Sequence, residues 1–264
     1  SGSIGENALS VIDSNKEKFE LIGISVHSNV EKANQIIKKY SPKYIYIFDK
    51  LAKDNLLKTE NAVIFEDEKE LSDVFNSKDV DIIIELIGGA EGPAKKLVFN
   101  ALKNRKHVVT ANKALIAKYG DRLAKIAEKN KVNLEFEASV CGGVPIIRSL
   151  KEGLIANKIS KIYGIFNGTS NYILSSMDKE NKEFNDVLIN AQKLGYAETN
   201  PSADLNGDDV SSKLKILTSL CFNSFLNNNI HVEGIKQIDK TDIDNANKLG
   251  YKIKLLGFAE LLNN

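Results

Sequence analysis

Residues 81–89 read Asp-Ile-Ile-Ile-Glu-Leu-Ile-Gly-Gly, an apolar and β-branched run that is ended by two glycines. A run of this kind predicts a strand that is buried on both faces, as in a parallel sheet. Gly92-Pro93 then begins a predicted helix to about Asn104, and the next strand is predicted over residues 107–110. The alternation of strand and helix indicates an α/β fold around this stretch.

The alternation continues on both sides of this stretch. We predict further strands over residues 19–26, 44–48, 63–65 and 134–138, and helices over residues 30–40 and 124–129. After about Pro145 we predict helices over residues 146–152, 170–177, 184–194, 210–220 and 242–249, and strands over residues 159–166, 230–238 and 251–259. The sequence therefore predicts a Rossmann-like, doubly wound parallel sheet over residues 1–140, followed by an α+β domain over residues 141–264.

The N-terminal region carries a weak nucleotide-binding signal. Small residues, Ser1-Gly-Ser-Ile-Gly5, open a helical pattern at Ala8, Leu9, Val11 and Ile12, and backbone N–H groups at such a helix start can bind a phosphate. No strand precedes them, so the sheet is expected to lack its first strand; the alternative is a flexible terminus. After the strand at 19–26, His27-Ser28-Asn29 contains no acid, which favours NADPH over NADH unless this is an ordinary polar turn.

The totals exclude several classes of protein. The chain has 264 residues with 36 basic and 35 acidic side chains, so it has no strong field for nucleic acid or anionic lipid. Cys141 and Cys221 imply no disulfide framework, and the three histidines share no zinc or triad pattern. No apolar run reaches the roughly 18 residues of a membrane span, and no leader peptide is recognised. We expect a cytoplasmic protein that binds neither nucleic acid nor membrane.

The stretch 195–213 concentrates acidic residues and one lysine. The turn dipeptides Asn200-Pro201 and Asn206-Gly207 predict that Glu198 and Asp204 lie on loops. Asp208 is a predicted N-cap, and Asp209 and Lys213 share a face of the helix that follows. Carboxylates that bind an ammonium group, beside a lysine that can transfer a proton, would suit a small zwitterionic substrate. The alternative is a surface ion pair.

Three other loops are candidates. Lys113 follows a buried strand and could reach a nicotinamide or a carbonyl, or be solvated. The Gly-rich loop from Glu137 to Pro145 could turn carbonyls around a hard cation, or be a tight interdomain turn. The turn at residues 167–171 could bind a carboxylate or cap a helix.

Several of these segments together resemble homoserine dehydrogenase over about residues 60–264. The matching segments are Glu85-Leu-Ile-Gly-Gly89, Val108-Val-Thr-Ala-Asn-Lys113, Glu137-Ala-Ser-Val-Cys-Gly-Gly143, Asn167-Gly-Thr-Ser-Asn-Tyr172 and the stretch 195–213. The resemblance implies reduction of aspartate semialdehyde to homoserine with NAD(P)H, in threonine and methionine biosynthesis, by a homodimer. It also implies that the chain stops before the family's closing segment, which returns to the dimer and nucleotide regions.

The resemblance implies roles for individual residues. Lys213 would donate the proton, Glu198 would bind the substrate's amino group, and Asp204 and Asp209 would hold the amino group and the lysine. Lys113 would lie between nicotinamide and substrate. The other implied positions line the substrate pocket (Tyr196, Gly168, Thr169) or form a site for Na⁺ or K⁺ (Glu137 with the carbonyls of Val140, Gly142 and Val144).

Residues 1 to about 50 instead resemble 1-deoxy-D-xylulose 5-phosphate reductoisomerase, through Ser1-Gly-Ser-Ile-Gly5, Phe19-Glu-Leu-Ile-Gly23 and Asn29-Val30. That family also uses NADPH, and the resemblance implies nucleotide contacts at Gly2, Ser3, Ile4, Ser28 and Asn29. Its Asp/Glu-Ser-Glu-His metal segment is missing, and Ala114 follows Lys113 where that family has Glu. Reductoisomerase chemistry is therefore the alternative to the dehydrogenase, as is an inactive nucleotide-binding fragment.

Overall fold

The computed structural model describes residues 2–59, 62–65, 67, 70–222 and 230–262. The chain forms two compact units. The first consists of Ser1–Ile87, Gly92–Val109 and Leu123–Leu134, and the second of Gly88–Glu91, Thr110–Arg122 and Glu135–Asn264. The units therefore do not coincide with a single cut near residue 140, because residues 110–122 and 135–140 group with the second. The division into an NAD(P)-binding and a catalytic domain stays a prediction.

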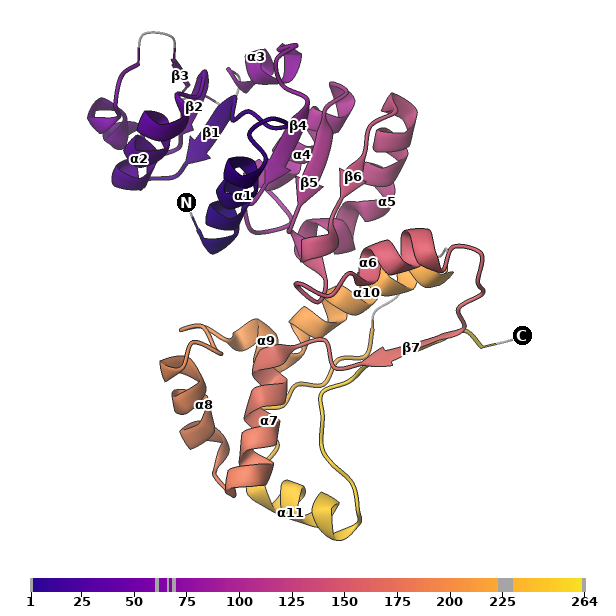
Figure 1. The fold of residues 1–264 in the computed structure, drawn as a ribbon. Coiled ribbons are helices and arrows are strands. Elements are labelled where there is room, and N and C mark those ends of the chain that lie inside the picture. Colours follow the sequence, from indigo (N-terminus) through magenta and orange to yellow (C-terminus); the bar gives the residue numbers. More distant parts are fainter. Residues whose placement is uncertain (1, 60–61, 66, 68–69, 223–229, 263–264) are drawn as a thin grey trace. The chain divides into compact units, whose positions relative to one another are not determined.

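The first unit contains a parallel sheet in the order β1-β2-β3, with Gly23 of β1 opposite Tyr44 of β2 (Figure 1). A second sheet has the order β4-β5-β6. The strands are β1 (Gly23–Val26), β2 (Tyr44–Ile47), β3 (Val63–Phe65), β4 (Ile82–Glu85), β5 (His107–Thr110) and β6 (Leu134–Glu135). The helices that alternate with them are α1 (Ser3–Ser14), α2 (Val30–Tyr40), α3 (Leu71–Asn76), α4 (Pro93–Lys103) and α5 (Lys113–Asn130), and a 3-10 turn covers Lys50–Asn55. The predicted α/β class with parallel strands is confirmed.

The helix α2 shows why this unit folds locally as it does. Asn29 caps its start, because its Oδ1 accepts a hydrogen bond of 2.9 Å from the backbone N of Lys32. Ala33 and Ile37, four apart, lie on one face and are fully buried against the sheet. The helix ends at Ser41, which is left-handed and precedes Pro42. Burying one such isoleucine contributes about 1.5–3 kcal/mol.

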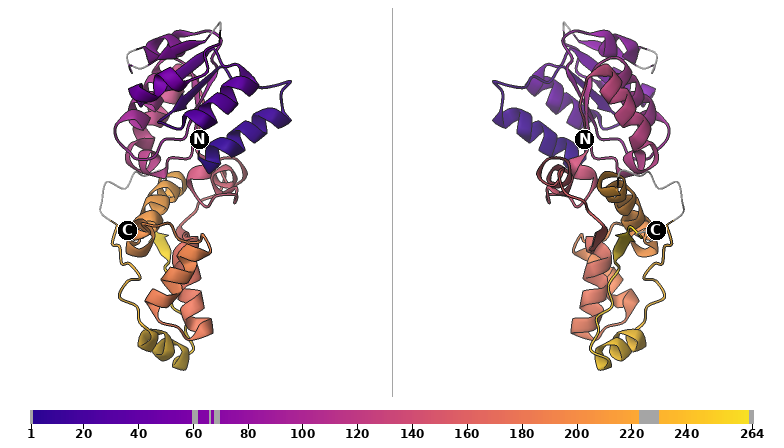
Figure 2. Two further views of the ribbon diagram at one scale, coloured as in Figure 1. Left: turned by 90° about the vertical axis from the view of Figure 1, so that its left-hand side faces the viewer. Right: turned by 90° about the vertical axis from the view of Figure 1, so that its right-hand side faces the viewer.

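The second unit is mainly helical. Its helices are α6 (Ile146–Arg148), α7 (Gly168–Glu180), α8 (Phe184–Lys193), α9 (Ser202–Asn206), α10 (Asp208–Phe222) and α11 (Lys240–Lys248). A 3-10 turn covers Glu137–Ser139, a π-helical turn covers Ser149–Gly153, and the strands β7 (Lys161–Gly164) and β8 (Gly257–Glu260) pair antiparallel. Helices α7 and α8 lie side by side (Figure 2), and their core includes Ile173, Leu174, Val187 and Ala191.

Several predicted elements differ from those observed. The helix predicted at 124–129 begins already at Lys113, Asp204 lies in the short helix α9 rather than on a loop, and the strands predicted at 19–26, 134–138, 159–166 and 251–259 are shorter. The strand predicted at 230–238 is wrong. There the backbone N of Ile235 donates to the carbonyl of Leu205 at 2.8 Å, so this segment packs on α9 instead of pairing in a sheet. Within the described ranges, no helix combines the length and the apolar character that a membrane crossing requires.

Candidate active site

A single pocket of about 770 Å³ in the second unit brings together the residues that were predicted to bind substrate or act in catalysis. All eight line it: Lys113, Gly168, Thr169, Tyr196, Glu198, Asp204, Asp209 and Lys213. They come from α5, α7, α9, α10 and the loop that follows α8. Residues far apart in the sequence therefore converge on one concave surface, as in most small-molecule sites.

The start of α10 positions Asp209 and Lys213. Gly207 has φ +86°, a left-handed conformation that ends α9 and lets the chain turn at once into α10. Asp208, predicted as an N-cap, is the first residue of the helix. Asp209 and Lys213 are one helical turn apart in the sequence, and Asp209 Oδ2 lies 2.6 Å from Lys213 Nζ. The Asp209 side chain is only 3% exposed and that of Lys213 16%, so the pair is not a surface ion pair.

A second lysine meets the other oxygen of the same carboxylate. Lys113 Nζ lies 2.5 Å from Asp209 Oδ1. Lys113 is the first residue of α5, and Asn112 holds this helix start: its Oδ1 accepts from the backbone N of Leu115 at 3.0 Å, and its Nδ2 donates to the carbonyl of Gly89 at 2.7 Å. The cap thereby fixes the direction from which Lys113 reaches the pocket.

The surroundings of Asp209 decide its charge. Burial raises the pKa of its carboxyl, but hydrogen bonds from Lys113, Lys213 and Asn167 outweigh burial, and the net pKa is below the usual range. Asp209 is therefore ionised at neutral pH. Lys213 also donates to the carbonyl of Phe166 at 2.7 Å, so two of the three N–H bonds of its ammonium point to known partners.

The rest of the pocket wall is held by α7. Thr169 Oγ1 donates to the carbonyl of Tyr196 at 2.7 Å, and the rings of Tyr172 and Tyr196 stack with centroids 4.5 Å apart. Gln192 Nε2 donates to the carbonyl of Glu198 at 3.2 Å. These contacts fix the backbone of the loop after α8, while the Glu198 side chain stays at the pocket surface.

The pocket carries balanced charge. Three lysines and three carboxylates line it: Lys113, Lys179, Lys213, Glu198, Asp204 and Asp209. Such a lining can bind a molecule that carries both an ammonium and a carboxylate group. Lys179 was not predicted from the sequence, and Asn167 was predicted only as part of a turn that binds a carboxylate or caps a helix. Helical spacing could have indicated Lys179, because it lies on the same face of α7 as Tyr172 and Ser175, which also line the pocket.

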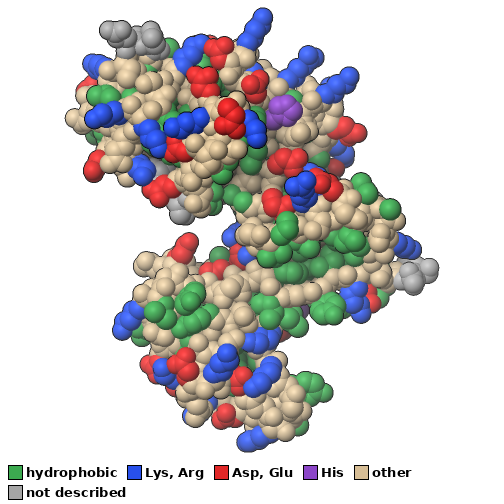
Figure 3. All heavy atoms as spheres, in the orientation of Figure 1, with side chains coloured by type: hydrophobic (Ala, Val, Ile, Leu, Met, Phe, Trp, Pro, Cys, Tyr) green, Lys and Arg blue, Asp and Glu red, His purple; other side chains and the backbone are tan. Residues whose placement is uncertain are grey.

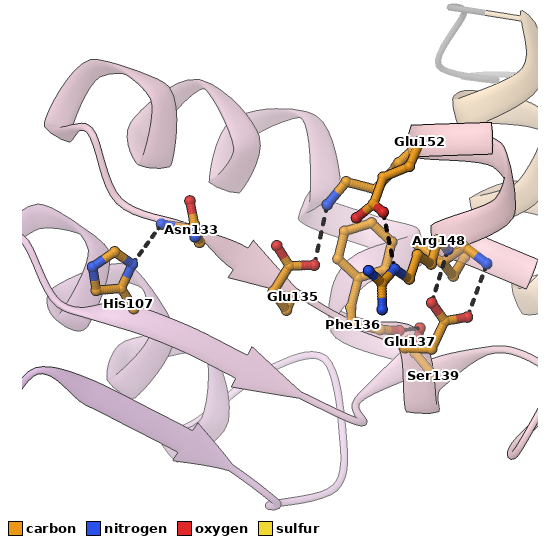
Figure 4. Close-up of polar contacts among 10 residues, drawn as sticks. His107, Asn133, Glu135, Phe136, Glu137, Ser139, Arg148 and Glu152 are labelled. Atoms are coloured by element: carbon orange, nitrogen blue, oxygen red, sulfur yellow. Dashed lines mark hydrogen bonds and ion pairs between the residues drawn. The ribbon is translucent and has the colours of Figure 1, made fainter. Parts of the chain in front are cut away.

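Residues of the predicted cation loop also make structural hydrogen bonds. Glu137 Oε1 and Oε2 accept from the backbone N of Ile147 at 2.9 Å and of Arg148 at 2.8 Å, so this carboxylate caps α6 (Figure 4). The carbonyl of Val144 accepts from the backbone N of Ile146. Two of the four predicted ligands thus already accept hydrogen bonds, and each oxygen keeps a further lone pair, so the cation site formed with Val140 and Gly142 stays a prediction. We assign it no step.

No group of three or more His, Cys, Asp and Glu side chains suited to a metal ion occurs among the residues with described positions. His107, one of the scattered histidines, has a structural contact in the first unit. Its Nδ1 accepts a hydrogen bond of 3.0 Å from the backbone N of Asn133 (Figure 4).

The predicted nucleotide residues lie at two helix starts of the first unit. Gly2 is the N-cap of α1 and makes no side-chain cap hydrogen bond, and Ser3 and Ile4 are the first helical residues. Ser28 and Asn29 form the turn into α2, whose N-cap is Asn29. An ion pair of 2.8 Å between Glu6 and Lys32 joins the first turns of the two helices. The two helix N-termini are therefore neighbours, an arrangement that suits phosphate groups.

Comparison with known proteins agrees with these motifs. The family model described as homoserine dehydrogenase matches residues 145–263, and that described as 1-deoxy-D-xylulose 5-phosphate reductoisomerase matches residues 1–120. The homoserine dehydrogenase of Neisseria gonorrhoeae is 51% identical over 181 residues, which are 68% of this chain and 41% of that protein. The enzyme of Helicobacter pylori is 42% identical over 243 residues, which are 90% of this chain and 56% of that protein.

Solved structures give the same result. The homoserine dehydrogenase of S. aureus at pH 7.5 superposes with a TM-score of 0.73 at 36% identity, over 99% of this chain and 58% of that one. A hyperthermophilic archaeal homoserine dehydrogenase in complex with NADPH shares the fold, with a TM-score of 0.54 at 22% identity, over 86% of this chain and 56% of that one. The chain thus spans about half the length of the curated relatives it matches. Over most of its length it is related to the homoserine dehydrogenases, and its N-terminal region matches the reductoisomerase family as well.

Proposed function

We propose that this chain carries the substrate site of a homoserine dehydrogenase, which reduces L-aspartate 4-semialdehyde to L-homoserine with NAD(P)H. The observation that carries the proposal is the buried carboxylate of Asp209 between Lys113 and Lys213, in a pocket with balanced charge. The substrate is a zwitterion with an aldehyde, so it needs groups for its ammonium, its carboxylate and its reacting oxygen. The pocket lining offers all three kinds of group.

The protein's part in the reaction is placement and proton transfer. A bound nicotinamide cofactor would supply a hydride to the aldehyde carbon. Lys213 has one N–H bond beyond those to Asp209 and Phe166, and this bond donates the proton that the resulting alkoxide needs. Glu198 and Asp204 bind the ammonium group, and the start of α7 at Gly168 and Thr169 offers N–H groups to the substrate carboxylate. The Asp209 carboxylate holds both lysines, Lys113 and Lys213, in place.

NADPH is the cofactor that the first unit supports best. The N-cap of α1 is Gly2, which has no side chain to accept from the first turn. The N–H groups of that turn can therefore bind a phosphate. Ser28 and Asn29 bring no acid to the end of β1, where a 2′-phosphate would be repelled by one. An archaeal relative of the same fold was solved with NADPH.

An additional strand would complete a doubly wound sheet in the first unit. In the described sheets β1 pairs with β2 alone and β4 with β5 alone. A groove of about 600 Å³ is lined by residues of both strands, among them Ile24, Ile82 and Ile84. An extended apolar segment that pairs with both strands would fill it. Extending the chain at its N-terminus with a β-branched segment should raise the melting temperature, whereas the same segment interrupted by proline should not.

A homodimer is supported by the face of the small β7–β8 sheet. Tyr163 and Phe258 are directly opposite in the register and are 71% and 56% exposed. Hydrophobic side chains gather on the surface in this region (Figure 3). On the opposite face, a Cβ at Gly257 would touch Phe166 and Val210, so that face is already packed. With this face as the dimer contact, Phe258→Glu should convert a dimer into a monomer in sedimentation velocity. The control Tyr251→Glu changes a tyrosine outside the sheet that is as exposed as Tyr163, and it should leave the dimer intact.

The test of the activity is homoserine oxidation followed by the absorbance of the reduced cofactor. We expect turnover with L-homoserine and NADP, and slower turnover with NAD. Turnover of 1-deoxy-D-xylulose 5-phosphate with NADPH and manganese, without homoserine oxidation, would replace this proposal by the reductoisomerase alternative. NADPH binding with neither activity would show an inactive nucleotide-binding fragment.

A further inference from the structure

The side chain of Asn167 contacts both Asp204 and Asp209. This side chain is buried, and it lies between two carboxylates of the pocket, those of Asp204 and Asp209. Its Nδ2 donates to Asp204 Oδ1 at 2.6 Å and to Asp209 Oδ2 at 2.9 Å. Its Oδ1 accepts from the backbone N of Ser170 at 2.7 Å. The amide orientation follows from these partners, because an N–H must meet an oxygen and a carboxylate must meet a donor.

Its position in the chain couples the helix start to the ion pair. Asn167 is the N-cap of α7, and the first residues of that helix, Gly168 and Thr169, line the pocket. The residue before it, Phe166, accepts with its carbonyl from Lys213 Nζ at 2.7 Å. Two successive residues therefore hold both members of the Asp209–Lys213 pair.

Two carboxylates this close repel each other unless a donor lies between them. Asp204 is on α9 and Asp209 on α10, and the two hydrogens of one amide group meet one oxygen of each. Of the small side chains that cap helices, only asparagine offers two donors together with one acceptor. Aspartate or serine in its place could still cap α7, but neither could donate to both carboxylates.

We propose that Asn167 is a positioning residue of the proposed reaction: its amide group keeps the Asp204 and Asp209 carboxylates side by side, so that Asp209 stays aligned with Lys213. This inference rests on the proposed function. The charged groups that face Asp209 are Lys113 from α5, Lys213 on its own helix and Asp204 from α9, and Glu198 and Lys179 line the same pocket. The thiol of Cys141 also interacts electrostatically with Asp209 and Lys213. Burial raises the pKa of Asp209, and Asn167 is one of the three hydrogen-bond donors that lower it, with Lys113 and Lys213.

The experiment separates positioning from capping with Asn167→Asp, which keeps the cap acceptor and the size of the side chain. We expect the cap of α7 to be kept, because aspartate caps helices as well as asparagine does, and the melting temperature at neutral pH to fall, because three close carboxylates repel each other. The acid limb of the kcat/KM profile for homoserine oxidation should move to higher pH, because a third carboxylate raises the pKa of Asp209. A shift of one unit lowers kcat/KM about tenfold on that limb. Asn167→Ser keeps a shorter cap but lacks the two amide N–H donors, so it should shift the acid limb in the same direction.

The matched control is Asp239→Asn, which exchanges the same two side chains at the N-cap of α11, outside the pocket. It should leave the profile unchanged. An unchanged profile in Asn167→Asp, or a lower melting temperature without a shifted limb, would overturn the positioning role and leave only a helix cap. Carboxyl ¹³C resonances of Asp209 titrated in both proteins give a readout that does not need activity: an equal pKa in the two would overturn the inference even if the original protein proves inactive on homoserine.

Discussion

Lys113 and Asp209 form an ion pair of 2.5 Å, although one begins α5 and the other lies in the first turn of α10. Helical spacing alone explains the contact of Asp209 with Lys213, one turn away. The contact with Lys113 exists only because folding brings two helix starts together within the second unit. The site is therefore a product of tertiary structure, and its properties depend on how those helix starts are held.

Asp209→Asn should lower stability in a pH-dependent manner. The folded-state pKa of Asp209 is below its ordinary value, so its contribution to the free energy of unfolding is complete above the unfolded value of about 4 and is lost as pH falls through the folded value. At neutral pH we expect a loss of about 1–3 kcal/mol, reduced from the buried-pair range because Lys113 is partly exposed. Urea unfolding between about pH 3 and pH 7 measures it. The matched variant Asp178→Asn, which loses an ion pair outside the pocket, should cost less at neutral pH. A difference between the original protein and Asp209→Asn that stays constant down to pH 3 would contradict the assignment.

Glu198→Gln should mainly weaken substrate binding. The amide keeps the size of the side chain but loses the charge that attracts the substrate ammonium, so KM for homoserine should rise about tenfold with a smaller change in kcat. Glu183→Gln, at the exposed start of α8, is the control and should leave both constants unchanged. The same KM in Glu198→Gln as in the original protein would exclude the ammonium contact.

Gly234→Ala should destabilise the second unit. A Cβ at this position would lie 2.3 Å from the carbonyl O of Leu205 and 2.8 Å from Cα of Asn206, and both are backbone atoms that cannot rotate away. The expected cost is roughly 1–3 kcal/mol, the usual range for overpacking. Differential scanning calorimetry should show a lower melting temperature for this variant than for Gly153→Ala, where a Cβ meets nothing within 4 Å. Equal melting temperatures would mean that the loop before Ile235 does not pack on α9.

Part of the fold could be predicted because local patterns determine it. The strand β2 is a buried, continuous apolar run, and α2 has its cap, apolar face and terminating proline in the sequence. The strand β4 is an equally apolar run, but Ile82 and Ile84 are 42% and 43% exposed, so the predicted burial of this strand on both faces is wrong. The segment 230–238 also has strand-like apolar residues. Its backbone nevertheless bonds to α9, and no local pattern shows that choice. Tertiary packing decided the outcome there.

The site, too, could be predicted only in part from the sequence. The i,i+4 spacing placed Asp209 and Lys213 on one face. The family resemblance placed Lys113 in the same site, but its ion pair with Asp209 was not predicted, because no spacing links the two segments. The turn that begins at Asn167 was a predicted helix cap, and its cap bond is present. The cap at Asn112 was missed, because the helix was predicted to lie further along the chain. The second bonds of Asn167, to Asp204 and Asp209, connect three elements and leave no trace in the sequence around it.

The central claim is that Lys213 transfers the proton in homoserine oxidation and reduction, and its most direct test is the turnover of Lys213→Ala and Lys213→Arg at saturating homoserine and NADP. General acid–base catalysis contributes roughly 10²–10⁴ in rate, so both variants should lose about that factor in kcat while NADPH affinity stays unchanged. Arginine should not rescue, because its guanidinium holds its proton too tightly. Lys215→Ala, on the same helix but outside the pocket, should turn over normally. Near-normal kcat in Lys213→Ala would contradict the account.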